Sequence, residues 1–180
     1  MASIYDIEVK HIDGTEGTLA DYRGKVLLVV NVASKCGLTP QYEGLEKLYE
    51  ANQPLGLEVL GFPANDFAGQ EPGSEAEIAS FCSLKFNVQF PMFSKISAVG
   101  KDQHPLYAAL TAAQPAATGD DAMRDRLKSF GMTPNPPPDV LWNFEKFLVG
   151  RGGDVVARFA PSVTAEDPRL LSAIELELSK

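Results

Sequence analysis

The feature that most constrains the fold is an unbroken apolar run at residues 26–30, followed at once by a mostly small and polar segment. The run, VLLVV, has the length and the β-branched content of a strand buried on both faces, as in a sheet covered by helices. After the polar segment, Thr39-Pro40 has the pattern of an N-cap followed by the first residue of a helix. Cys36 is therefore predicted to lie between the end of a core strand and the start of a helix.

This position favours a reactive Cys36. Unpaired N–H groups and the dipole at a helix N-terminus stabilise a thiolate, and the neighbouring Lys35 adds a positive charge. A free cysteine more often behaves as a small buried hydrophobe, but Ser34, Lys35 and Gly37 would make a poor apolar pocket. The local pattern alone leaves both interpretations open.

The rest of the chain alternates predicted strands and helices. Residues 4–19 predict a hairpin that turns at Asp13-Gly14, and residues 57–62 predict a second core strand, parallel to the first. The predicted helices follow the 39–40 cap, a capping box at Ser74 and Glu77, His104-Pro105, and Asp167-Pro168. The further predicted strands are a short edge strand at 90–96 and a hairpin formed by 143–149 and 155–159.

Two segments lack a regular pattern. Residues 63–73 follow the end of a core strand, so their polar side chains, Asn65, Asp66, Gln70 and Glu71, are expected to face the same crevice as Cys36; a solvated loop is the alternative. Residues 114–139 are rich in proline and predict an irregular insertion with one helical turn near 123–127. Too little chain follows this insertion to build another core, so residues 1–180 are predicted to form a single domain.

Charge and composition exclude several classes of partner. A formal charge of -8 argues against nucleic acid and anionic membranes, which bind basic surfaces. The chain shows neither a leader-like N-terminus nor an apolar run of membrane-spanning length, which predicts a cytoplasmic protein without a membrane anchor. Cys36 and Cys82 are too few for a disulfide framework, and with His11 and His104 they lack the spacing of a metal site.

Three separate segments of the chain together resemble the signature segments of a known protein family. Residues 30–39 (VNVASKCGLT), 62–73 (FPANDFAGQEPG) and 141–153 (LWNFEKFLVGRGG) resemble, in order and spacing, the signature segments of the glutathione peroxidase family. The resemblance implies an α/β thioredoxin-like fold, a central mixed sheet flanked by helices, here with an N-terminal β-hairpin. It places the peroxidatic position, often a selenocysteine, on Cys36, and it implies that Gln70, Trp142 and Asn143 surround that sulfur.

The residue types suit the implied chemistry. A thiolate attacks one peroxide oxygen while the other leaves as an anion, so the site needs donors that stabilise developing negative charge. Gln70 and Asn143 carry amide donors and Trp142 an indole N–H, and none of these groups titrates. The product would be a sulfenic acid on Cys36. An external thiol, rather than a bound cofactor, would reduce it again. Such an activity is expected in a response to oxidative stress.

The resemblance also bears on the reductant. Cys82 matches the resolving cysteine of family members that resemble thioredoxin-dependent peroxidases, whereas glutathione would attack the sulfenic acid directly. A Cys36–Cys82 redox-active disulfide would be reopened by thioredoxin. We expect the reduced thiols to be too far apart to bond, so the helix at 74–84 would have to loosen.

Other functions have their own requirements. A disulfide oxidoreductase needs C-x-x-C, but Thr39 occupies the second cysteine position. A peroxiredoxin would place threonine and arginine around the sulfur, and a redox-sensing module would function without turnover. The sequence leaves open the oligomeric state and the preferred peroxide, whether hydrogen peroxide, an organic hydroperoxide or a lipid hydroperoxide.

Overall fold

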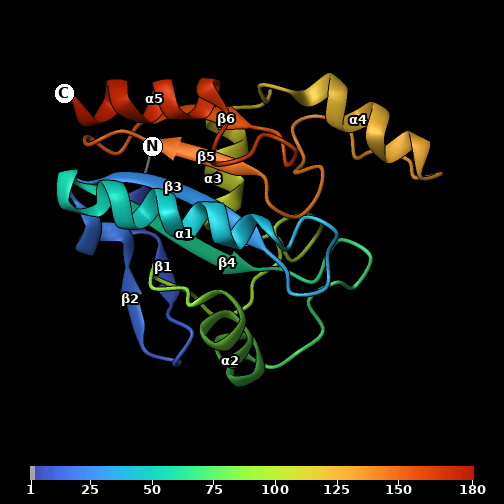
Figure 1. The fold of residues 1–180 in the computed structure, drawn as a ribbon, viewed down its shortest axis with the longest axis horizontal. Helices are drawn as coiled ribbons and strands as arrows, with labels where there is room; N and C mark the ends of the chain where they lie inside the picture. The colour runs from blue at the N-terminus through green and yellow to red at the C-terminus, as the bar shows by residue number, and fades with distance from the viewer. Residues whose placement is uncertain (1–2) are drawn as a thin grey trace.

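The apolar run forms β3 (Val26–Val32), an inner strand of a four-stranded sheet in the computed structural model, which describes residues 3–180. The other strands of this sheet are β4 (Leu57–Pro63), β5 (Lys146–Val149) and β6 (Val155–Phe159), and the strand order is β4-β3-β5-β6. β3 pairs parallel with β4 and antiparallel with β5, which in turn pairs antiparallel with β6. The predicted mixed sheet is confirmed (Figure 1).

Helices cover the sheet on both faces. The α-helices of residues 3–180 are α1 (Gln41–Asn52), α2 (Glu75–Phe86), α3 (Pro105–Ala113), α4 (Asp120–Ser129) and α5 (Pro168–Leu178), of which α4 lies beyond the sheet rather than over it. The predicted caps of α2, α3 and α5 are confirmed, since Ser74, His104 and Asp167 each accept a main-chain N–H from the first turn. Within residues 3–180, no helix combines the length and apolar character needed to cross a membrane.

Successive β3 side chains enter opposite cores, as the period of a strand requires. Val26, Leu28 and Val30 pack in a cluster with side chains of α1 and α5, while Leu27 and Val29 join α3 and the N-terminal hairpin. Every residue of β3 is fully buried. Its continuous hydrophobicity therefore reflects burial on both sides.

The N-terminal hairpin is confirmed, with β1 (Glu8–Lys10) antiparallel to β2 (Glu16–Thr18). Its predicted extent was wrong at both ends, because 3₁₀ helices occupy Ile4–Asp6 and Leu19–Tyr22. In each case a hydroxyl at the preceding residue, Ser3 or Thr18, accepts a main-chain N–H and closes a tight turn. A third 3₁₀ helix, Gln53–Leu55, follows α1.

The predicted edge strand at 90–96 was wrong. This segment makes isolated bridges, including Gly61 with Met92 and Ala64 with Ile96, but no continuous ladder. Gly61 donates its N–H to Pro91 and accepts one from Phe93. Pro91 has no N–H to extend the pairing, so the segment follows β4 without forming a strand.

The insertion at 114–139 is more regular than predicted. It contains the whole of α4, ten residues long, where the sequence suggested one helical turn. Met123 and Leu127 are the buried residues of this helix, and Arg124 pairs with Asp120 one turn earlier at 2.7 Å. In Figure 1, α4 lies at one end of the molecule, beyond the sheet.

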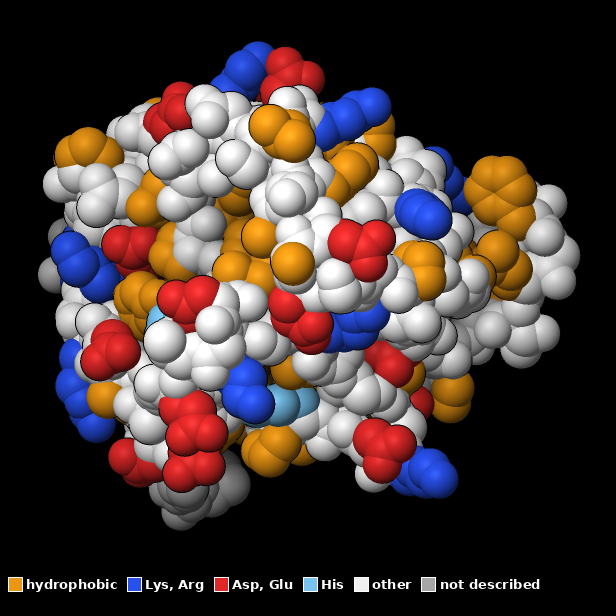
Figure 2. All heavy atoms as spheres, turned by 90° about the horizontal axis from the view of Figure 1, so that it is seen from below, with side chains coloured by type: hydrophobic (Ala, Val, Ile, Leu, Met, Phe, Trp, Pro, Cys, Tyr) orange, Lys and Arg blue, Asp and Glu red, His pale blue; other side chains and the backbone are white. Residues whose placement is uncertain are grey.

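The molecular face shown in Figure 2 carries acidic and basic side chains interspersed with apolar ones. The Lys and Arg side chains on this face do not merge into a continuous basic patch. A nucleic acid would require such a patch to neutralise its phosphates. The mixed charges of this face accompany a formal net charge of -8.

Candidate active site

Three segments meet at one edge of the sheet. β3 and β4 run parallel, so the segments after them, which carry Cys36 and Gln70, emerge at the same edge. β5 runs antiparallel to β3, so the segment just before it, which carries Trp142 and Asn143, arrives at that edge too. Strand direction thus gathers residues that are far apart in the sequence.

A pocket of about 190 Å³ opens at this edge, and Cys36, Gln70 and Trp142 all line it. The other lining residues come from the Cys36 turn and from α4 with the residues after it: Gly37, Leu38, Met123, Arg126, Leu127, Phe130 and Met132. The structure therefore brings Cys36, Gln70 and Trp142 together. The insertion at 114–139, which was predicted to be irregular, supplies one side of the pocket.

Cys36 is held in a tight turn, with 8% of its surface exposed. The N–H of Leu38 donates to Cys36 Sγ at 3.3 Å, an interaction that is stronger with a thiolate than with a thiol. Thr39 Oγ1 accepts the Cys36 N–H at 3.0 Å and donates to the Ala33 carbonyl at 2.8 Å. The prediction of Thr39 as a helix cap was wrong, because α1 begins at Gln41 and the Thr39 hydroxyl closes the cysteine turn instead.

Asn143 is fully buried and does not line the pocket. Its Nδ2 donates to Gln70 Oε1 at 2.9 Å, so the oxygen end of the Gln70 amide is occupied. The amide N–H groups of Gln70 are then the end left to donate into the pocket. The Gln70 carbonyl also accepts the Lys35 N–H at 3.0 Å, which ties this loop to the cysteine turn.

The other polar residues of the 63–73 loop do not join the Cys36 pocket. Asn65 Oδ1 accepts the Glu71 N–H at 2.9 Å, and Asp66 accepts the Ala98 N–H at 2.7 Å. These side chains hold the loop in shape, so the expectation that they face Cys36 was wrong. Glu71 lies in a neighbouring pocket with Ser34.

Asn31 fixes the segment that carries Trp142, and the sequence analysis missed it. Its Nδ2 donates to the Trp142 carbonyl at 3.1 Å, and its own carbonyl accepts the Phe144 N–H at 2.6 Å. Phe144 has φ of 69°, an unusual conformation outside glycine, which explains why β5 starts at Lys146 rather than at the predicted residue 143. The sequence signal that could have identified Asn31 is an amide side chain directly after an apolar run predicted to be buried. A buried amide needs hydrogen-bond partners.

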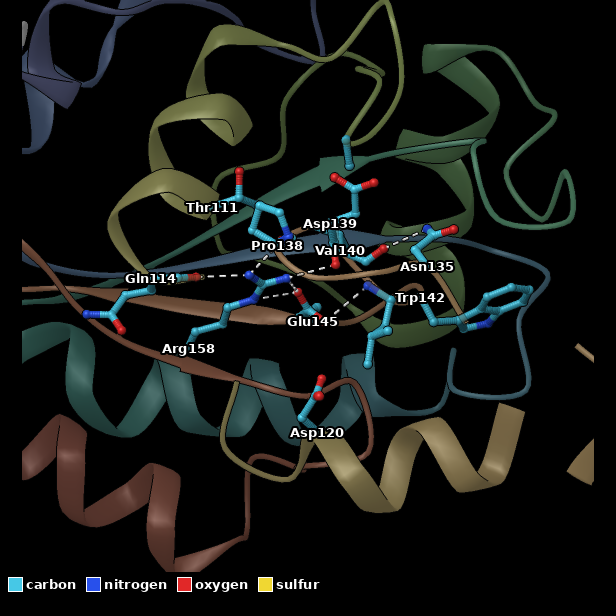
Figure 3. Close-up of polar contacts among 12 residues, drawn as sticks. Thr111, Gln114, Asp120, Asn135, Pro138, Asp139, Val140, Trp142, Glu145 and Arg158 are labelled. Carbon is cyan, nitrogen blue, oxygen red and sulfur yellow. Dashed lines mark hydrogen bonds and ion pairs between the residues drawn. The ribbon is translucent and has the colours of Figure 1, made fainter. Parts of the chain in front are cut away.

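A buried ion pair anchors the insertion beside this segment (Figure 3). Arg158 Nε and Nη2 donate to Glu145 Oε2 at 2.8 and 2.5 Å. The guanidinium also donates to main-chain oxygens at both ends of the insertion, those of Gln114, Pro138 and Asp139. Glu145 Oε1 accepts the Leu141 N–H at 3.3 Å, next to Trp142. One pair thus ties the insertion to the Trp142 segment.

Cys82 lies on the buried side of α2 and belongs to the same core cluster as Cys36. Both thiols are free. Burial raises the pKa of Cys82 to about 11; the Tyr42 hydroxyl opposes this rise and the charge of Glu71 adds to it. The thiol is therefore protonated at neutral pH.

Known proteins share the sequence and the fold of this chain. The sequence model of the family described as glutathione peroxidase matches residues 4–111. The protein named thioredoxin/glutathione peroxidase BtuE, from Escherichia coli, is 52% identical over 180 residues, which cover 99% of this chain and 98% of that protein. The crystal structure of T. cruzi GPX1 has a TM-score of 0.72 and 32% identity, covering 99% of this chain and 97% of that one.

A more distant neighbour supports the fold alone. A thioredoxin family thiol:disulfide interchange protein from Chlorobium tepidum superposes with a TM-score of 0.61 at 12% identity, covering 99% of this chain and 98% of that one. The predicted thioredoxin-like fold is thereby confirmed. The family match and the identity over nearly the whole chain also confirm the family predicted from the sequence: this chain belongs to the glutathione peroxidase family of peroxidases.

Proposed function

We propose that this protein is a thiol peroxidase in which the Cys36 thiolate reduces hydroperoxides. Cys36 Sγ would attack one peroxide oxygen, the oxygen–oxygen bond would break, and the sulfur would become a sulfenic acid. The other oxygen would leave with its electron pair and take a proton to give water or an alcohol. The observation that carries the proposal is the shared pocket of Cys36, Gln70 and Trp142.

The polar groups of the pocket suit this step. The Gln70 amide and the Trp142 indole supply N–H donors for the anion that forms as the peroxide bond breaks. Asn143 would act through Gln70, because its amide is bound to Gln70 Oε1. None of these donors titrates, so the stabilisation would not depend on pH.

The rim of the pocket is largely apolar. Phe130 is 67% exposed and Met132 is 38% exposed, and both line the same pocket as Cys36. Such a rim can contact the organic part of an alkyl or lipid hydroperoxide, while hydrogen peroxide needs only the polar end. We therefore propose both hydrogen peroxide and organic hydroperoxides as substrates.

We further propose that the sulfenic acid is recycled by thioredoxin through a Cys36–Cys82 disulfide, by glutathione directly, or by both. Support comes from the free Cys82 in α2 and from the similarity to a protein named thioredoxin/glutathione peroxidase. The loosening of α2 stays a prediction. Both reductants are maintained in a reducing compartment, so this cycle would operate in the cytoplasm during oxidative stress, without a bound cofactor.

Replacing Gln70 by leucine should lower kcat/KM for hydroperoxide by about 10² to 10³, because one N–H donor to the developing anion is lost. Initial rates at limiting hydroperoxide would measure this effect. Gln103→Leu is the matched control, since its amide donates to the Ala98 carbonyl and it does not line the Cys36 pocket. A Gln70→Leu rate equal to that of the control would remove Gln70 from the mechanism.

Replacing Cys82 by serine should abolish turnover coupled to thioredoxin, because no internal disulfide can form, and should leave the first oxidation of Cys36 intact. The measurement is NADPH consumption with thioredoxin and its reductase, run beside a glutathione-coupled assay. A surviving glutathione-coupled rate would indicate direct reduction. An unchanged thioredoxin-coupled rate would rule out the resolving role.

A further inference from the structure

Lys146 is a fully buried lysine that the proposed chemistry does not use. It is the first residue of β5 and closely follows Trp142 in the sequence. Among residues 3–180, no carboxylate forms an ion pair with it. A buried charge is unfavourable unless an opposite charge or hydrogen bonds compensate it, so this ammonium in the core calls for an explanation.

The ammonium of Lys146 donates to three oxygens that come from three segments of the chain. It bonds to Gln41 Oε1 at 2.7 Å, to the Phe144 carbonyl at 2.6 Å and to the Pro161 carbonyl at 3.0 Å. An ammonium has three N–H donors, whereas a neutral amine has two. Only the protonated lysine can therefore donate to all three oxygens.

Two of these oxygens belong to segments on either side of the candidate active site. Gln41 is the first residue of α1, the helix that follows the Cys36 turn. Phe144 directly follows Asn143 in the segment that carries Trp142. One buried ammonium thus links the helix that follows the reactive sulfur to the segment that supplies its partners.

The backbone at Phe144 is held by hydrogen bonds on both of its polar groups. Its N–H donates to the Asn31 carbonyl at 2.6 Å, and its own carbonyl accepts from Lys146 at the same distance. A non-glycine residue with φ of 69° keeps that conformation where the surrounding contacts impose it. Loss of the bond from Lys146 would therefore let this turn relax and would displace Trp142 and Asn143.

We propose that Lys146 is a positioning residue that sets Trp142 and Asn143 against the reactive sulfur. This inference rests on the proposed peroxidase function and concerns its first step, the cleavage of the peroxide bond. Lys146 does not line the Cys36 pocket, so it acts through Phe144, to whose carbonyl it donates. A displacement of about 1 Å in the groups of an active site can cost about 10² in rate.

The charge of Lys146 gives this role a pH dependence. Burial lowers the pKa of Lys146 to about 7, and the charges of Glu145 and Glu166 oppose that fall. Its partners across the sheet, Val30 in β3 and Phe159 in β6, do not titrate. As the pH rises through this pKa, the amine loses one donor and one of its three acceptors is left unpaired. The turn should therefore be held less firmly at pH 9 than at pH 6.

The test compares two reactions of Cys36 in wild type and in Lys146→Met protein, where an apolar side chain of similar length replaces the ammonium. Alkylation by iodoacetamide needs only the thiolate, whereas oxidation by hydroperoxide also needs the N–H donors. Mass spectrometry of the peptide that contains Cys36 would follow both reactions. We expect oxidation to slow by about 10² and alkylation to change by less than about threefold.

The fluorescence of Trp142, the only tryptophan in the chain, reports whether the turn has moved. A red-shifted emission is expected in Lys146→Met, because the displaced indole becomes more exposed to water. Arg151→Met is the matched control, since its guanidinium also donates to three oxygens, the main-chain oxygens of Gly24, Leu55 and Leu178. Arg151 does not line the Cys36 pocket, so this variant should keep both rates and the emission of wild type.

A pH profile tests the proposal on wild type alone, and it decides the matter if Lys146→Met does not fold. Dividing the oxidation rate by the alkylation rate removes the titration of Cys36 itself. This ratio should fall by about tenfold between pH 6 and pH 9 in wild type, because one hydrogen bond of Lys146 is lost, and should stay level in the variant. A level wild-type ratio, or equal oxidation rates in the two proteins, would overturn the role of Lys146. An equal loss of oxidation and alkylation in the variant would place the effect on the sulfur and overturn it too.

This proposal and the proposed function fail in different ways. Wild-type protein that does not oxidise Cys36 would contradict the peroxidase function itself. Wild-type protein that oxidises Cys36 with a ratio independent of pH would contradict only the role of Lys146.

Discussion

Replacing Cys36 by serine is expected to lower hydroperoxide turnover by at least about 10³-fold, the largest effect on activity of any single substitution in this chain. A serine hydroxyl is not ionised at neutral pH and cannot attack the peroxide at a comparable rate. The Leu38 N–H, the Gln70 amide and the Trp142 indole all remain, so the loss would report the sulfur alone. Peroxide consumption with glutathione and with thioredoxin measures it.

The Cys36→Ser protein must also be shown to fold. Serine is close to cysteine in size, and Thr39 Oγ1 accepts the main-chain N–H of residue 36, which the substitution keeps. The thermal unfolding midpoint should therefore change little. A variant that folds and keeps its turnover would show that another group reacts with peroxide. A non-catalytic redox-sensing module would give the distinct result of oxidation at Cys36 without repeated turnover.

Replacing Arg158 by leucine should lower the free energy of unfolding by about 3–5 kcal/mol, because it leaves the charge of Glu145 buried and unpaired. The side chains of Arg158 and Glu145 are 3% and 0% exposed. Main-chain oxygens of Gln114, Pro138 and Asp139 would also lose their donor. Chemical denaturation followed by circular dichroism measures the change.

An exposed ion pair provides the comparison. Lys47 and Glu43 of α1 lie 3.2 Å apart with side chains 72% and 68% exposed, so Lys47→Ala should cost less than about 1 kcal/mol. Arg158→Leu should also lower hydroperoxide turnover, because the insertion that forms one side of the Cys36 pocket loses the hydrogen bonds of Arg158. Equal stabilities of the two variants would contradict the role given to the buried pair.

Much of this architecture could be predicted from local pattern. The apolar run that became β3 has a length and composition that fit a two-sided strand, and the direction of β4 follows from the intervening helix. Placing Gln70 near Cys36 then needs only the rule that parallel strands end at one edge. The position of Trp142 came instead from the resemblance of residues 141–153 to a family segment.

Local pattern failed where distant contacts decide the conformation. Thr39 has the chemistry of a helix cap, but its hydroxyl bonds to Ala33 and Cys36 in the turn before the helix. Phe144 adopts a positive φ where Asn31, far away in the sequence, binds the Trp142 carbonyl and the Phe144 N–H. Neither outcome can be obtained from neighbouring residues alone.

The insertion shows a different limit. Prolines and glycines flank α4, so the sequence pattern did not predict a helix of ten residues there. Met123 and Leu127 are the buried residues of this helix. The first turn of α4 is acidic and its last turn is basic, and both suit the helix dipole. The prediction gave more weight to the surrounding prolines than to this charge pattern. The buried ion pair between Arg158 and Glu145 depends on tertiary contacts, and no local sequence pattern predicts it.

The most direct test of the peroxidatic role of Cys36 is to trap its oxidised form. Cys82→Ser protein would receive one equivalent of hydroperoxide and then a sulfenic acid reagent such as dimedone, with mass spectrometry locating the adduct. One adduct per chain is expected, confined to the peptide that contains Cys36, with one equivalent of alcohol released. Peroxide consumed while Cys36 stays a free thiol would contradict the mechanism.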